Sequence, residues 1–210
     1  MDNISKPIKR FDTADKIAGT AKYVADFKFE DMLYARTLRS TEARAIIKSR
    51  KYPKLEEGYF IVDKDDVPGE NIVHVVFDDQ PCFADKVVNY IGEPILLVVG
   101  KDKEKILDIM SKIEIEYEKL DPILSIEDGI NPKNPIYGEK NCFADYKYKK
   151  GSIENIKKRA KYVIEGEYET GYQEHIYLEP QGAIGVYKNG KVTVYSTMQC
   201  PYFVKGAVEK

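Results

Sequence analysis

The sequence has few of the residues that bind metals or form disulfides. It contains two histidines and three cysteines. Cys82, Cys142 and Cys200 lie far apart and none belongs to a CxxC pair, which argues against a zinc or iron–sulfur site within this chain. An odd number of cysteines also favours reduced thiols over a disulfide framework. We therefore expect no metal ligands in this sequence.

Long apolar runs and an excess of basic charge are missing as well. The longest aliphatic run, Ile95 to Val99, is far too short for a membrane-spanning helix, which needs about 20 apolar residues. Residues 1–11 lack the apolar core of a signal peptide. The 33 Lys and Arg residues are balanced by 35 Asp and Glu residues, which argues against a nucleic-acid-binding protein. These absences predict a cytoplasmic protein that binds neither membranes nor nucleic acids.

The N-terminal part combines strand and helix signals. Residues 32–40 predict a strand, and the apolar run at residues 92–100, bounded by glycines, predicts a strand covered on both faces. The alternation of apolar and charged residues at 112–118 predicts a third strand with one solvent-facing side. Together these signals predict a compact α+β unit, which we assign to residues 1–128.

A helix is predicted between the last two of these strands. Asp102 stands where an N-cap residue is preferred. Ile106, Leu107 and Met110 follow at helical spacing, so we expect them on one side of the helix. This helix would cover one face of the predicted sheet.

The chain then changes character. Residues 129–147 are rich in Pro, Asn and Gly without a sustained period, and they form the predicted linker. Ser152 can cap a short second helix, with Ile153 and Ile156 on its buried face.

Strand-like segments dominate the C-terminal part. Residues 161–170 and 172–180 have the composition of strands, and Asn189-Gly190 predicts a type I′ hairpin turn. Pro201 suits the first position of a helix that has hardly begun when the sequence stops. We expect residues 148–210 to be a truncated second domain; the alternative is that they pack on the first domain.

The segment at residues 172–180 gathers Gln173, Glu174, His175 and Glu179 among aromatic residues. A zinc site needs three or four ligands, and this segment offers one histidine and a carboxylate at best. In a regular strand the two glutamates lie on opposite faces, which argues against an acid–base pair. The chain therefore holds no complete catalytic constellation, and the simplest interpretation of His175 is a half-buried, hydrogen-bonded ring.

Several sequence blocks follow one another in a recognisable order: RFDTADKIAGTAKYVAD, LYARTLRSTEARAIIKS, DVPGENI, FADKVVNYIGEPILLVVG, IEIEYEKLDPILSIEDGI, YETGYQEHIYLEP and YSTMQCP. In this order and spacing they resemble the N-terminal part of the large, molybdenum-cofactor subunit of the xanthine dehydrogenase and aldehyde oxidoreductase family. Three positions depart from the family pattern. Arg44 stands where a histidine is usual, Ser152 where an aspartate is frequent, and Met198 interrupts a Ser-Thr-Gln triplet.

The resemblance implies an α/β hammerhead domain at residues 1–128, the linker at 129–147, and the first strands of a molybdopterin-binding domain at 148–210. It implies a molybdenum–pterin cofactor in the full-length subunit, with FAD and 2Fe–2S clusters in partner subunits or domains. The expected activity is xanthine dehydrogenase-like oxidative hydroxylation of a purine, another N-heterocycle or an aldehyde. Expected partners are iron–sulfur and flavin subunits and a purine-like substrate, and a homodimer is allowed.

The resemblance also assigns candidate site residues. Gln199 matches the family glutamine whose amide donates a hydrogen bond to the molybdenum's oxo ligand; the alternative is an ordinary polar residue at a helix entry. Gln173, His175 and Glu179 fall in a stretch that lies beside the active-site region, so a pocket or domain wall is favoured for them. The family's catalytic glutamate comes from farther along the subunit. We expect no catalytic residue within this chain and no activity from it alone.

A second function hypothesis belongs to another class of protein. The chain can be a free-standing, non-catalytic hammerhead module that docks onto a separate molybdenum subunit. A finished module should close its last helix, whereas a fragment can stop within an element.

Overall fold

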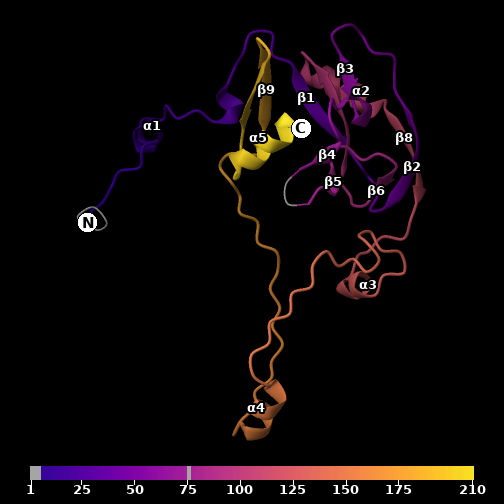
Figure 1. The fold of residues 1–210 in the computed structure, drawn as a ribbon. Helices are drawn as coiled ribbons and strands as arrows, with labels where there is room; N and C mark the ends of the chain where they lie inside the picture. The colour runs from indigo at the N-terminus through magenta and orange to yellow at the C-terminus, as the bar shows by residue number, and fades with distance from the viewer. Residues whose placement is uncertain (1–5, 75–76) are drawn as a thin grey trace.

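The strands between Tyr34 and Lys119 include two antiparallel three-stranded sheets. The computed structural model describes residues 6–74 and 77–210 (Figure 1). In the first sheet the strand order is β1 (Tyr34–Arg39), β7 (Pro94–Gly100), β3 (Phe60–Val62). In the second sheet it is β6 (Val87–Val88), β2 (Ala45–Lys51), β8 (Glu114–Lys119). Helix α2 (Lys103–Ser111) connects the sheets and packs against β7 and β1.

The remaining elements lie outside these two sheets. They are α1 (Thr13–Ala18), the 3₁₀ turns η1 (Val24–Asp26) and η2 (Lys64–Asp66), the paired β4 (Ile72–Val73) and β5 (Gln80–Pro81), α3 (Ile126–Ile130), α4 (Ile153–Arg159), the hairpin of β9 (Ala183–Lys188) and β10 (Lys191–Ser196), and α5 (Pro201–Glu209). None of the described helices is both long and apolar enough to cross a membrane.

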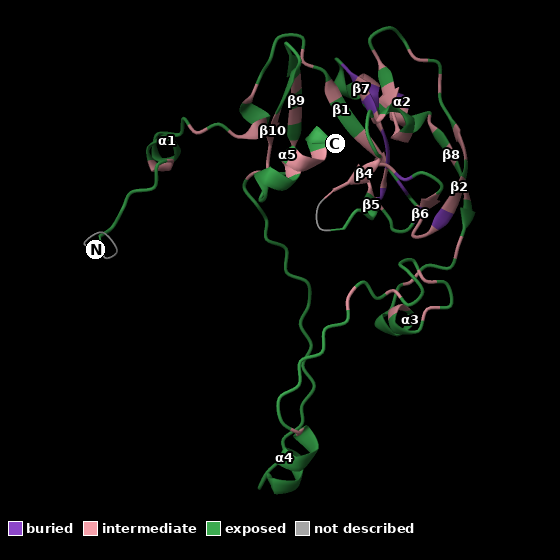
Figure 2. Cartoon of the chain, in the orientation of Figure 1, coloured by how far each residue is buried: buried purple, intermediate pink, exposed green. Residues whose placement is uncertain are grey.

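The hydrophobic core lies between the sheets and α2. Its fully or nearly fully buried apolar residues are Ala45, Ala84, Val88, Ile95, Leu96, Val98, Ile106 and Ile109. Three of them belong to β7, and the neighbours Ile95 and Leu96 point to opposite faces of their sheet. The predicted strand covered on both faces is therefore confirmed. In Figure 2 the buried residues are confined to this part of the chain.

Helix α2 begins where the sequence indicated. The Asp102 carboxylate accepts hydrogen bonds from the backbone N–H groups of Glu104 (2.8 Å) and Lys105 (2.9 Å), which confirms the predicted N-cap. The predicted inner face is only partly right. Ile106 is fully buried, but Leu107 is 55% exposed, because the next turn directs Ile109 to the core instead.

Arg44 holds the start of the linker against β2. Its guanidinium donates to the backbone carbonyls of Asn134 (2.7 Å), Asp121 (3.3 Å) and Pro135 (3.3 Å). A guanidinium carries several N–H donors on one rigid plane, so a single side chain can hold three carbonyls. Arg44, one of the three residues that depart from the family pattern, thus fixes the chain where it leaves the first domain.

The hairpin is confirmed in its register and its turn. Strands β9 and β10 pair from Ala183↔Ser196 to Lys188↔Lys191. Asn189 and Gly190 both have left-handed backbones, with φ of 51° and 75°. Positive φ at both central positions is what a type I′ turn requires, and Asn-Gly adopts it with little strain.

Residues 161–170 and 172–180 are not strands, so two predictions are wrong. Both segments lack regular secondary structure. They belong to an extended segment that carries α4 away from the sheets (Figure 1), here called the arm (residues 144–178 and the start of the hairpin approach at 179–180). A strand is stable only when its backbone N–H and C=O groups find a neighbouring strand, and the described residues provide none here. Ile176 also has φ of 49°, which interrupts the alternation of faces.

The short helix α4 is capped as predicted but buries nothing. Ser152 accepts a hydrogen bond from the backbone N–H of Asn155 at 3.3 Å. Ile153 and Ile156, expected on a buried face, are 73% and 58% exposed. Helical spacing predicts which residues share a face, but whether that face is covered depends on distant parts of the protein.

We predict that the side chains on the inner face of α2 contribute more to stability than those on its outer face. Ile106→Ala should lower the free energy of unfolding by about 2–5 kcal/mol, because it opens a cavity in the core. Leu107→Ala, the adjacent control on the outer face, should change it by less than about 0.5 kcal/mol. Urea denaturation of the two variants measures the difference, and equal effects would contradict this account of the core.

Candidate functional site

Gln199 lies in the bend between β10 and α5. It is exposed, and no hydrogen bond to its amide is formed within the part of the chain that the structure describes. The preceding Met198 lines a groove of about 590 Å³ between β10 and α5. The apolar side chains of Val194 and Val204 line the same groove. Met198 therefore contributes to the apolar lining of this groove, whereas Gln199 is not among the lining residues.

Hydrogen bonds fix the backbone just before Gln199. Thr197 donates from its hydroxyl to the carbonyl of Pro180 (3.2 Å) and from its backbone N–H to the carbonyl of Gly182 (3.2 Å). The Ser196 hydroxyl donates to the same Gly182 carbonyl at 3.0 Å. The hairpin is thereby extended to residues 180–182 and 196–197. Gln199 follows two residues after this anchored end.

Glu179 connects the hairpin to the N-terminal segment. Its carboxylate accepts a hydrogen bond from the backbone N–H of Val24 at 2.9 Å, a contact that is partly buried and spans 155 positions in the sequence. Val24 is the first residue of η1. Hydrogen bonds to an ionised acceptor are roughly twice as strong as neutral ones. Sequence reasoning placed Glu179 near a pocket, and it gave no indication of this partner.

Aromatic packing reinforces the same junction. The ring of Tyr195 on β10 lies 5.0 Å from the ring of Phe27 and 5.5 Å from that of Phe29, between ring centroids. A side chain added at Gly182 would come within 3.3 Å of a methyl carbon of Val24. The backbone at Gly182 and the N-terminal segment therefore fit closely together.

Gln173 and His175 lie elsewhere. Both are exposed on the arm, and no hydrogen bond among the described residues joins either of them to Gln199. The His175 ring stacks on Tyr177 with 5.5 Å between centroids, and its backbone N–H donates to Glu174 at 3.0 Å. The prediction of a half-buried ring is wrong, because the arm has no sheet to lie on.

The other histidine has partners that sequence reasoning missed. His74 has a side chain only 9% exposed, and its Nδ1 lies 2.7 Å from a carboxylate oxygen of Asp78. This hydrogen bond lowers the pKa of Asp78 below its ordinary value. The Lys210 ammonium nitrogen lies 3.4 Å from the same ring nitrogen. Among the described residues no group of three or more His, Cys, Asp or Glu side chains is arranged to hold a metal ion.

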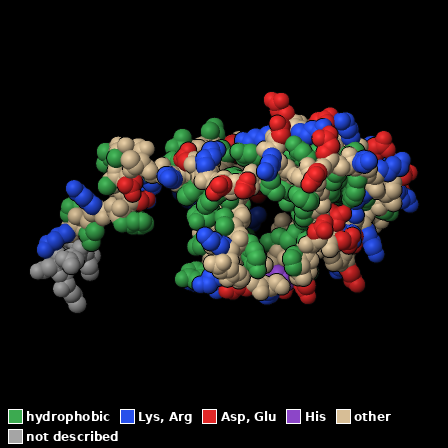
Figure 3. Space-filling model, turned by 90° about the horizontal axis from the view of Figure 1, so that it is seen from above, with side chains coloured by type: hydrophobic (Ala, Val, Ile, Leu, Met, Phe, Trp, Pro, Cys, Tyr) green, Lys and Arg blue, Asp and Glu red, His purple; other side chains and the backbone are tan. Residues whose placement is uncertain are grey.

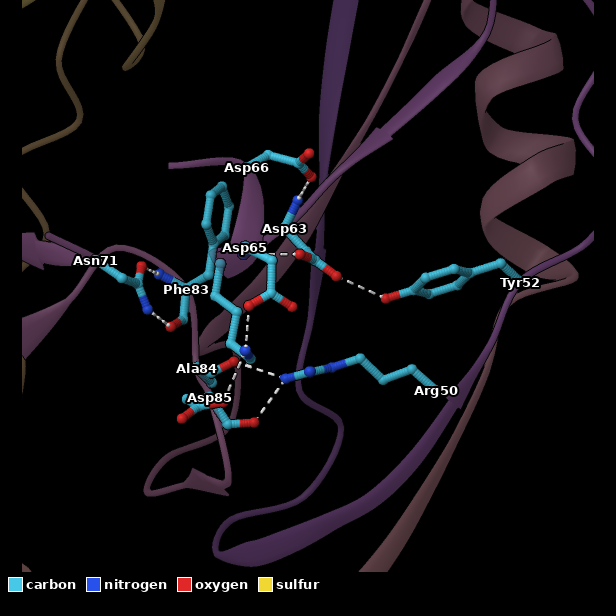
Figure 4. A network of polar contacts seen from close by, with 10 residues as sticks. Arg50, Tyr52, Asp63, Asp65, Asp66, Asn71, Phe83, Ala84 and Asp85 are labelled. Atoms are coloured by element: carbon cyan, nitrogen blue, oxygen red, sulfur yellow. Dashed lines mark hydrogen bonds and ion pairs between the residues drawn. The ribbon is translucent and has the colours of Figure 1, made fainter. Parts of the chain in front are cut away.

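Figure 4 shows a polar network within the first domain. The Arg50 guanidinium donates to the carbonyls of Ala84 (2.8 Å) and Asp85 (2.7 Å), which ties their loop to β2. The Tyr52 hydroxyl donates to the Asp63 carboxylate at 3.0 Å. Partial burial and this bond raise the pKa of Tyr52 to about 12.

Lys and Arg side chains are mixed with Asp and Glu side chains over the face seen in Figure 3, and that face shows no basic patch.

We predict that Tyr52 ionises only at strongly alkaline pH. Its folded pKa is raised, so the stability that it contributes is present below pH 10 and is lost as the pH rises from 10 towards about 12. In an absorbance titration of tyrosinate, Tyr52→Phe should remove a transition near pH 12, and Asp63→Asn should shift that transition downward. The chain unfolded in denaturant is the control, where the transition should lie near 10.

Comparisons with known proteins cover nearly the whole chain. Residues 18–121 match the model of the aldehyde oxidase and xanthine dehydrogenase a/b hammerhead domain, and residues 135–210 match that of the molybdopterin cofactor-binding domain. The chain is 31% identical over 204 residues to the nicotinate dehydrogenase large molybdopterin subunit of Eubacterium barkeri, with 95% of this chain covered. It is 34% identical over 204 residues to xanthine dehydrogenase of Dictyostelium discoideum, with 94% covered.

Solved structures show the same fold. Quinoline 2-oxidoreductase from Pseudomonas putida 86 superposes with a TM-score of 0.83 at 22% identity, covering 96% of this chain and 28% of that one. Aldehyde oxidoreductase from Desulfovibrio gigas gives 0.71 at 22% identity, covering 89% and 23%. The chain spans about half (48%) of the Eubacterium barkeri protein and 14% of the Dictyostelium one. The predicted α+β fold class, a hammerhead domain followed by the start of a molybdopterin-binding domain, is confirmed.

Proposed function

This chain belongs to the aldehyde oxidase and xanthine dehydrogenase family, and we propose that it is the N-terminal portion of a molybdenum hydroxylase large subunit that acts on an N-heterocycle. The observation that carries the proposal is the order of the two matched domain models within one chain. Xanthine dehydrogenases and a nicotinate dehydrogenase are among its relatives at 30% identity or more, and the names of both refer to nitrogen heterocycles. A purine is the substrate that we favour.

The residues present fit one contact to a molybdenum–pterin cofactor. When bound, the cofactor supplies the redox centre at which the substrate is oxidised. Gln199 offers an exposed amide with no partner among the described residues, at the end of an anchored hairpin. An amide N–H can donate to a metal's oxo ligand without taking up or releasing a proton, which suits a group that orients the metal centre. We place the remaining contacts and the catalytic glutamate outside this chain.

The proposed subunit needs electron-transfer partners. We propose iron–sulfur and flavin subunits or domains of the same cytoplasmic complex, since this chain has only three separated cysteines and cannot hold the clusters itself. A homodimer of the complex is compatible with this arrangement.

The arm supports the view that further protein completes the structure. Its apolar side chains are unusually exposed, with Tyr146, Ile164 and Tyr168 each more than 90% accessible. Exposed apolar surface of this extent is a feature of interfaces rather than of free monomers. The free-standing hammerhead module shares this need for a partner. It is disfavoured because the match to the cofactor-binding domain extends through residues 135–210.

The proposal is tested on the natural protein and its complex. Metal analysis should find molybdenum, and xanthine or nicotinate should be oxidised with an artificial electron acceptor. Residues 1–210 expressed alone should contain no molybdenum and oxidise neither compound. A natural protein without molybdenum, or an active isolated chain, would contradict the proposal.

We predict that Gln199→Ala in the natural enzyme lowers kcat by about 10- to 100-fold, the range typical of lost outer-shell hydrogen bonds to a metal centre. Molybdenum content should stay unchanged, because the pterin and the remaining contacts still hold the metal. Gln80→Ala, which alters an exposed glutamine of β5 in the first domain, is the matched control. An unaltered kcat in Gln199→Ala would assign Gln199 to the helix entry alone.

A further inference from the structure

Two hydrogen bonds connect the N-terminal segment to residues 179–180, and residues 179–180 to Thr197. The Val24 N–H is bound by the Glu179 carboxylate at 2.9 Å, and the next carbonyl along the chain, that of Pro180, accepts the Thr197 hydroxyl at 3.2 Å. Gln199 follows two residues after Thr197. Because these two hydrogen bonds involve adjacent residues, we propose that Glu179 is a positioning residue. It fixes the backbone of residues 179–182, which in turn holds Thr197 and thereby the amide of Gln199 in place. This inference rests on the proposed function of Gln199.

Glu179 is suited to this role because it stands at the junction of the unstructured arm and the ordered hairpin. Residues 161–178 make no strand pairs, whereas residues 180–182 are bonded to 196–197. A free arm would transmit its motion into residues 180–182. The bond to Val24 stops that motion one residue before the hairpin contacts begin.

The other side of the junction is held by packing contacts. Phe27 and Phe29 pack on Tyr195, and a β-carbon at Gly182 would lie in tight contact with Val24, at 3.3 Å from its methyl carbon. The apolar contacts hold the N-terminal segment and the hairpin together, but because they are not directional they do not fix the orientation of the backbone. The bond from Val24 to Glu179 is directional, and among the described residues it is the one side-chain hydrogen bond between residues 20–30 and 170–199.

Charge is not required for the proposed role, which sets it apart from a catalytic one. The Val24 N–H needs an acceptor, and the carbonyl oxygen of a glutamine side chain can replace a carboxylate oxygen at the same distance. A residue that exchanged protons with substrate would lose its activity on the same substitution. Glu179→Gln should therefore be close to wild type, whereas Glu179→Ala should not.

The experiment uses the natural holoenzyme with four substitutions: Glu179→Ala, Glu179→Gln, Thr197→Val and Glu174→Ala. Glu174 is the matched control, since its carboxylate is exposed on the arm and, among the described residues, accepts a hydrogen bond only from the N–H of the adjacent His175. Each variant is assayed for molybdenum content, for kcat and KM, and for amide hydrogen exchange in the peptides that cover residues 22–29 and 195–200. The paramagnetic resonance spectrum of Mo(V) reports separately on the surroundings of the metal.

Glu179→Ala is expected to lower kcat about tenfold at unchanged KM, to alter the Mo(V) spectrum, and to speed exchange in both peptides at least several-fold. Glu179→Gln and Glu174→Ala should match the wild type in all readouts. Thr197→Val should speed exchange at 195–200 alone and alter the spectrum in the same way. If Glu179→Ala fails to accumulate, Thr197→Val still tests the inference, because it removes the hydrogen bond between Thr197 and Pro180 that links Glu179 to Gln199.

Unchanged exchange at 195–200 in Glu179→Ala, or a Thr197→Val spectrum identical to that of the wild type, would overturn the inference. A glutamine variant as defective as the alanine variant would also overturn it, and would point to a role for the charge. Failure of the proposed function looks different: Gln199→Ala would then leave kcat and the Mo(V) spectrum unchanged, whatever Glu179 does.

Discussion

The burial of β7 is the constraint on which the rest of the described structure depends. This strand pairs with β1 on one side and β3 on the other, and α2 lies across it. Both of its faces are covered, so its backbone hydrogen bonds and its side chains are removed from water together. The second sheet is joined to it through Ala45, Val88 and the residues of α2. The hammerhead part can therefore be understood from its own residues.

The C-terminal part follows a different principle. Its described residues add nothing to the buried core, and its order comes from a hairpin, a few hydrogen bonds and one aromatic junction with residues 24–29. Arg44 holds the linker at one end of this region, and Glu179 holds the hairpin at the other. Between these two anchors the arm exposes the apolar side chains that a larger protein would cover. The positions of the anchors, rather than a core, decide where Gln199 lies.

What could be predicted from the sequence was local. The apolar run of β7, the cap at Asp102, the cap at Ser152 and the Asn189-Gly190 turn each depend on residues within one element, and each was predicted correctly. Residues 161–180 were predicted as strands because their composition suits strands, yet pairing requires a neighbour that composition cannot supply. Gln199 is identified as a candidate only by the family resemblance. The bond of Glu179 to Val24 could not be anticipated, because nothing local links residues so far apart.

That separation of 155 positions has a consequence for biosynthesis. A ribosome adds about 5–20 residues per second, so the N-terminal segment emerges many seconds before the hairpin that it will contact. During this interval Phe27 and Phe29 have no Tyr195 to pack on and are available to chaperones or to misassembly. The hammerhead sheets can form meanwhile from contacts that are already synthesised. The contacts between residues 24–29 and the hairpin then form late. A cofactor placed beside Gln199 could bind to the completed site only after these contacts have formed.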